Sequence, residues 1–79
     1  MTRLQMAEAG REAAARALLG RDATAEQMGF EDYESGLVDV LTNLMHFADR
    51  YELNFEEQLS RSYGHYRAEV QFAWEEETA

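Results

Sequence analysis

The chain has 79 residues, of which 46% are hydrophobic and none is cysteine or proline. Its 16 acidic residues outnumber seven basic ones, and the formal net charge is -9. In a chain of this length, the core leaves few apolar residues to line an enclosed active-site cavity. The net negative charge repels phosphate groups. We therefore expect neither an enzyme nor a protein that binds nucleic acids or membranes directly.

The absence of cysteine excludes disulfides and thiolate metal sites, and it favours a reducing compartment. No apolar stretch has the length of a membrane span or the flanks of a secretory leader. These features predict a cytoplasmic protein whose single domain, residues 1–79, is stabilised by packing alone.

The first helix is expected over residues 3–19. This segment is rich in alanine, which has the highest helix propensity, and Gly20 follows it as a stop. Thr24 with Gln27 three residues later matches a capping box. This pattern predicts a short helical turn over residues 24–28 that connects two longer helices.

The second helix is expected over residues 31–53. Apolar side chains at helical spacing cover about half of its circumference, including Leu37, Leu41, Leu44 and Phe47. A face this wide needs two packing partners. We therefore predict that this segment is the central helix of a small bundle.

The third helix is expected over residues 55–76, because Asn54 and Glu57 have the spacing of a capping box. Its apolar stripe should close the core, and it contains Phe55, Leu59, Tyr63, Tyr66, Val70 and Ala73. Phe72 projects to the opposite side and Trp74 lies at the margin, so both are candidate apolar contact residues. The predicted fold is an all-α bundle of three main helices with a short connecting turn.

Residues with catalytic or metal-binding chemistry do not form a convincing constellation. His46 and Asp49 have the i, i+3 spacing of paired metal ligands and His65 could supply a third, but nothing in the sequence demands a metal. Ser60 or Ser62 could meet His65, but the sequence offers no obvious oxyanion donor or orienting group. We expect no catalytic residue, no metal site and no cofactor.

Acidic residues are concentrated beyond the first helix. Residues 1–22 carry four arginines against three acidic residues, whereas the other 57 residues carry a net charge of -10. If the second and third helices are antiparallel neighbours, their outer faces form a negative surface that could imitate a phosphate array. The candidate partner-binding residues are Asp39, Asp49, Glu52, Glu56, Glu57, Glu69 and Glu76.

Residues 36–70 resemble a loose family of small acidic proteins encoded by phages, prophages and plasmids. The shared pattern is a helix of the form L-x-x-L-x-x-L-x-H-x-x-D, with Val38 at its first leucine position, followed by an F-x-x-x-L helix that ends in H-Y-x-A-E. The matching residues are Leu41, Leu44, His46, Asp49, Phe55, Leu59, His65, Tyr66, Ala68 and Glu69.

The chain is also similar in size and charge to anti-CRISPR proteins that inhibit type I effector complexes. This resemblance implies a non-enzymatic inhibitor, in the cytoplasm of a bacterial host, that covers the basic DNA-binding surface of such a complex. The alternative is a phage accessory or regulatory module that binds a protein partner through apolar contacts. Both a monomer and a homodimer are compatible with the sequence.

Overall fold

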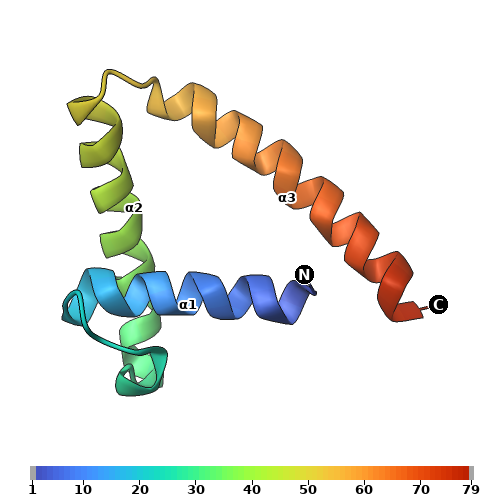
Figure 1. Ribbon diagram of the computed structural model, residues 1–79, viewed down its shortest axis with the longest axis horizontal. Coiled ribbons are helices and arrows are strands. Elements are labelled where there is room, and N and C mark those ends of the chain that lie inside the picture. The colour runs from blue at the N-terminus through green and yellow to red at the C-terminus, as the bar shows by residue number, and fades with distance from the viewer. Residues whose placement is uncertain (1, 79) are drawn as a thin grey trace.

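The structure, a computed structural model, describes the backbone of residues 2–78 and the side chains of residues 2–71. The described residues form three long helices and no strand, which confirms the predicted all-α class (Figure 1). The elements in chain order are α1 (Arg3–Leu19), the 3-10 helices η1 (Ala25–Gln27) and η2 (Phe30–Asp32), α2 (Tyr33–Arg50) and α3 (Phe55–Thr78).

The turn between α2 and α3 ends the second helix at Arg50, three residues earlier than the sequence suggested. The Leu53 N–H donates to the Ala48 carbonyl over 2.8 Å, and the Glu52 N–H donates to the Asp49 carbonyl over 3.3 Å. This pair of bonds is a Schellman motif, which requires a left-handed residue that glycine usually supplies. Here the position is occupied by Glu52, with φ 57°.

Side-chain caps fix where two of the helical segments begin. The Glu57 N–H donates to Asn54 Oδ1 over 3.0 Å, so Asn54 caps α3 as its spacing suggests. Before η1, the Thr24 N–H donates to Gln27 Oε1 over 2.9 Å. The second main helix begins at Tyr33 rather than near residue 31, because Phe30–Asp32 forms the separate turn η2.

The closed core lies where α1 crosses α2, and it is built from small residues. Ala15 and Ala25 are fully buried, and Ala14 and Met28 are almost so. A Cβ atom placed on Gly36 would lie 3.2 Å from both the Ala14 Cβ and the Met28 Sδ. The two helices can therefore cross this closely only because α2 has a glycine at the contact.

Polar contacts of Arg11 surround the same crossing. Its Nη1 donates to the Tyr33 hydroxyl over 3.2 Å, its Nε lies 3.2 Å from the Glu8 carboxylate, and its Nη2 lies 3.9 Å from that of Glu26. The hydrogen bond with Tyr33 raises the pKa of Arg11, and the two carboxylates act in the same direction. One guanidinium thus connects α1, η1 and the start of α2.

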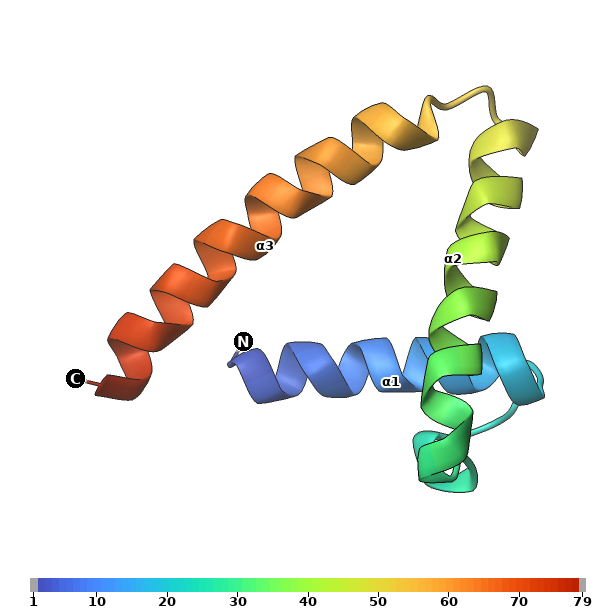
Figure 2. The ribbon, with the colours of Figure 1, turned by 180° about the vertical axis from the view of Figure 1, so that it is seen from behind.

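The third helix diverges from α2 after the turn and meets α1 only near the N-terminus of α1, so the three helices outline a triangle (Figures 1 and 2). The expectation that α3 closes the core along α2 is therefore wrong. Leu44 of α2 is 44% exposed, and Leu59 of α3 is 51% exposed. The short turn, fixed by the Schellman motif and the Asn54 cap, sets α3 on this divergent course.

Candidate functional site

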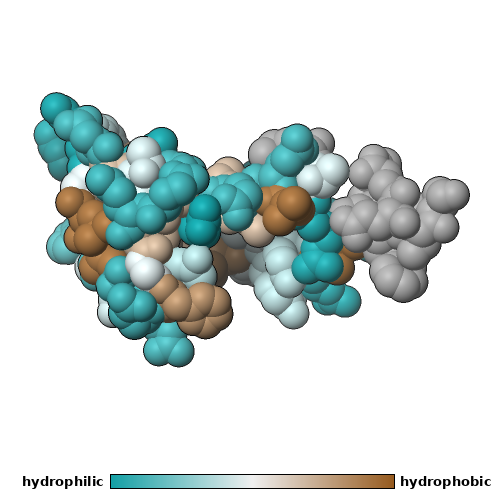
Figure 3. All heavy atoms as spheres, turned by 90° about the horizontal axis from the view of Figure 1, so that it is seen from below, coloured by the Kyte–Doolittle hydropathy of each residue, from teal (hydrophilic) through white to brown (hydrophobic). Residues whose placement is uncertain are grey.

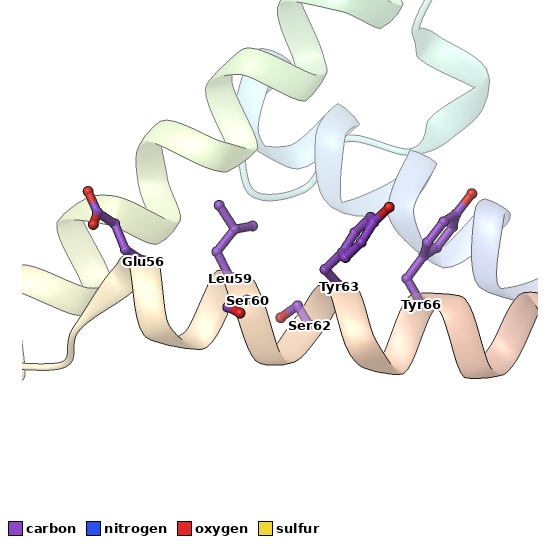
Figure 4. Close-up of a pocket in the computed structure, with 6 residues that line it drawn as sticks. All are labelled: Glu56, Leu59, Ser60, Ser62, Tyr63 and Tyr66. Carbon is purple, nitrogen blue, oxygen red and sulfur yellow. The ribbon is translucent and has the colours of Figure 1, made fainter.

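Exposed apolar side chains line the sides of α2 and α3 that face the inside of the triangle. We call this surface the inner groove and define it by Leu41, Leu44, Phe47, Leu59, Tyr63 and Tyr66. Figure 4 shows that Leu59, Tyr63 and Tyr66 project from one side of α3, toward the side where α1 and α2 lie. The helical spacing predicted this alignment, and the structure leaves the aligned side chains uncovered.

The inner groove consists of two adjoining hollows. One, of about 340 Å³, is lined by residues of α2, the turn and the start of α3, namely Leu41, Leu44, Phe47, Ala48, Leu53, Phe55, Gln58, Leu59 and Ser62. The other, of about 640 Å³, is lined by Glu56, Leu59, Ser60, Ser62, Tyr63 and Tyr66 (Figure 4). Since they share Leu59 and Ser62, the surface is continuous, and Glu56 is its single charged residue.

The aromatic rings of this region make contacts within their own helices. The rings of Tyr63 and Tyr66 are stacked with centroids 6.4 Å apart, and Phe47 meets the Tyr51 ring edge to face at 5.6 Å. The Arg67 guanidinium carbon lies 5.8 Å from the Tyr63 ring centroid. Such contacts restrict the rings before any partner binds, which lowers the entropy cost of using them as contact residues.

Apolar side chains are also exposed at the corner of the triangle where α1 meets α3. A further hollow of about 230 Å³ lies where α1 meets α3, and it is lined by Arg3, Met6, Ala7, Tyr66, Glu69 and Val70. Figure 3, the view from below, shows separate brown apolar patches among teal hydrophilic residues. Apolar exposure therefore extends beyond the α2–α3 turn.

The predicted acidic residues are distributed over α2, the α2–α3 turn and α3. Glu52 lies in the turn, Glu56 lines the inner groove, and Glu69 lies beside the start of α1. Asp49 and Glu57 are exposed and line neither hollow of the groove, whereas Asp39 is half-buried. The side chain of Glu76 lies outside the described residues, as do those of Phe72 and Trp74.

Ion pairing separates the two halves of the chain. Four ion pairs are present among the described side chains, and all of them join residues between Glu8 and Glu26. Within the described residues of α2, the turn and α3, no acidic side chain lies in an ion pair. The negative charge of these segments is therefore not compensated by neighbouring arginines.

The described residues supply no group of three or more His, Asp or Glu side chains that could hold a metal ion. His46 and His65 are exposed on α2 and α3 respectively. Among the same residues, no helix is both long enough and apolar enough to cross a bilayer.

Sequence reasoning assigned the residues of the inner groove to the core and so missed them as a surface. The available signal was the width of the apolar face of the second helix, which a short chain must cover with two partners. In the structure α1 crosses α2 near Gly36, whereas Leu41, Leu44 and Phe47 further along α2 remain 37%, 44% and 54% exposed.

Comparisons of the chain with protein-family models, with curated proteins and with solved structures found no significant match.

Proposed function

We propose that the chain is a non-catalytic protein-interaction module that binds a helix in its inner groove. The observation that supports this proposal is the exposure of apolar side chains that recur every three or four residues on two helices, with Tyr63 61% and Tyr66 55% exposed. Single exposed apolar residues are ordinary, but contiguous apolar patches of several hundred Å² mark interaction surfaces. This groove is contiguous from the α2–α3 turn to Tyr66.

A helix is the element that suits the shape of the groove. The lining residues recur at helical spacing on both α2 and α3, and a helix with its side chains is roughly 10 Å across. An amphipathic helix could place its apolar stripe between the diverging helices, as in other helix-in-groove interactions. Tyr63, Tyr66 and Phe47 would be its principal contacts, since aromatic residues are enriched among energetically dominant interface positions.

Site-specific photo-crosslinking in bacterial cells tests this proposal. A photoreactive phenylalanine derivative replaces Tyr63 in one variant and His65 in the matched control, which lies two residues away on a different side of α3. We expect a discrete crosslinked adduct from position 63 and none from position 65. Absence of an adduct at position 63, or equal labelling at both positions, would contradict the proposal.

A second candidate function is inhibition of a nucleic-acid-binding complex, such as a type I CRISPR effector, through the acidic surface. It is supported by the acidic side chains of α2 and α3 that make no ion pair among the described residues, including the exposed Asp49 and Glu57. Such side chains could attract the basic surface that normally binds DNA. The attraction would weaken with added salt, since exposed charges are screened over about 8 Å at physiological ionic strength.

A DNA-shift assay of a type I effector complex tests this second candidate. The double variant with Asp49→Arg and Glu57→Arg should lose inhibition, whereas Asn43→Arg, which adds positive charge without removing an acidic side chain, should retain most of it. If the double variant inhibits as well as the original chain, the acidic surface is not the binding site.

A further inference from the structure

We infer that the inner groove is filled by a second copy of this chain and that the functional unit is a homodimer. This inference rests on the proposed interaction module and names its partner. Four observations support it: the surplus surface of the single chain, the size of that surplus, the presence of only one charged residue in the lining of the groove, and the composition of the groove from paired helical stripes.

The single chain exposes far more surface than a closed protein of its mass. Its accessible surface is 6591 Å², whereas a folded monomer of this mass exposes about 4,900 Å². Its radius of gyration is 14.3 Å, against about 11.6 Å for a compact domain of this length. Groove side chains contribute to this surplus, because the divergence of α3 leaves Leu44, Leu59 and Tyr63 44%, 51% and 61% exposed.

The surplus has the size of an obligate dimer interface. It amounts to roughly 1,700 Å² per chain, or about 3,400 Å² when two chains cover each other. A standard interface between preformed partners covers about 800 Å² on each side, and obligate homodimers cover about 2,000–5,000 Å² in total. A small peptide or a weak transient partner would leave most of the surplus uncovered.

The groove is suited to pairing with itself. In a two-fold dimer the same surface is used by both chains, so it must offer both a hollow and the side chains that fill it. The hollow beside Leu44 and the projecting rings of Tyr63 and Tyr66 lie on adjacent segments of one surface. The α3 stripe of one copy could therefore occupy the hollow of the other, and the reverse.

Charge argues against a basic partner at this particular surface. Glu56 is the single charged residue in the lining of the two hollows, and depletion of charge is typical of the centre of an interface. Each copy carries a formal charge of -9, so two copies repel each other at long range. Added salt should therefore strengthen this association, whereas it weakens binding to a basic partner.

Sedimentation equilibrium of the purified chain tests the inference. We expect a mass of twice the 9.1 kDa of one chain, and a dissociation constant that falls when moderate salt is added. Leu44→Glu and Leu59→Glu should each raise that constant at least about a hundredfold, because two carboxylates then replace two buried leucines. His46→Glu, two residues from Leu44 on the opposite side of α2, is the matched control and should leave it within a few-fold.

In sedimentation, a mass of one chain at all concentrations, or groove variants that dimerise as well as the control, would overturn the inference. If the groove variants unfold, thermal unfolding of the unmodified chain at several concentrations still tests the inference, because the midpoint of a dimer rises with concentration. A midpoint independent of concentration overturns the dimer. A crosslink from position 63 to a different protein would contradict the homodimer but would still support the proposed interaction module. Absence of any crosslink from position 63 would contradict both proposals.

Discussion

The crossing of α1 and α2 depends on Gly36, and replacing this residue by alanine tests that dependence. Alanine normally stabilises a helix interior relative to glycine, by about 1 kcal/mol. At Gly36, however, the new methyl group would lie 3.2 Å from the Ala14 Cβ and 3.4 Å from the Ala14 carbonyl oxygen. These atoms belong to α1 itself and have no rotamer through which to move aside.

The expected magnitude follows from these two opposing effects. Overpacking a close contact costs about 1–3 kcal/mol, although the flexible Met28 side chain, 3.2 Å away, can yield part of the space. Gly64 provides the matched control, since it lies within α3 and a Cβ there would meet nothing within 4 Å. Gly64→Ala should stabilise the chain by up to about 1 kcal/mol, so the two variants should differ by roughly 1–3 kcal/mol.

Thermal unfolding followed by far-ultraviolet circular dichroism measures this difference, with both variants at the same chain concentration. For a domain of this size, 1 kcal/mol corresponds to a shift of about 4–8 °C in the midpoint. Gly64→Ala should melt above the original chain and Gly36→Ala at or below it. Equal stabilisation by both substitutions would refute the close crossing of α1 and α2.

The turn between α2 and α3 yields two further predictions. Glu52→Gly should raise the free energy of unfolding by about 1 kcal/mol, because glycine adopts the left-handed conformation at φ 57° without steric cost; an unchanged urea midpoint would speak against that conformation. Asn54→Ala should lower it by about 1 kcal/mol, because the Glu57 N–H loses its side-chain acceptor at 3.0 Å. Asn54→Asp, which keeps an acceptor oxygen, is the control for the second change, and equal losses in both variants would argue against a capping role.

The sequence indicates the helices because their signals are local. Alanine-rich composition, the spacing of Asn54 and Glu57 and the periodic leucines all act within a few residues of the structure that they specify. The end of α2 is less apparent because the left-handed position in the turn is taken by Glu52, where glycine would have marked it. The end of α2 is fixed by backbone hydrogen bonds, and these cannot be recognised from the residue types in the sequence.

The angle between α2 and α3 could not be predicted in the same way. The periodic spacing of apolar residues indicates that one face of a helix is apolar, but it does not indicate which other element covers that face. Leu44 and Leu59 fit a closed bundle as well as an open triangle, and their exposure follows from the geometry of four turn residues. The same limit applies to the acidic residues, because Glu56 and Glu57 are neighbours in sequence while only Glu56 lines the groove.

The two proposed surfaces are physically compatible, because they differ in chemistry and in place. Pairing at the inner groove would leave Asp49 and Glu57, which lie outside its lining, free to meet a basic partner. A dimer would carry a formal charge of -18, twice the -9 of one chain, on a single rigid particle. Attraction to a basic surface grows with the number of negative charges presented together. Dimerisation through the groove would therefore strengthen the binding of the acidic residues to a basic partner. A groove variant that stays folded but monomeric should therefore inhibit a DNA-binding complex more weakly, even though it keeps every acidic residue.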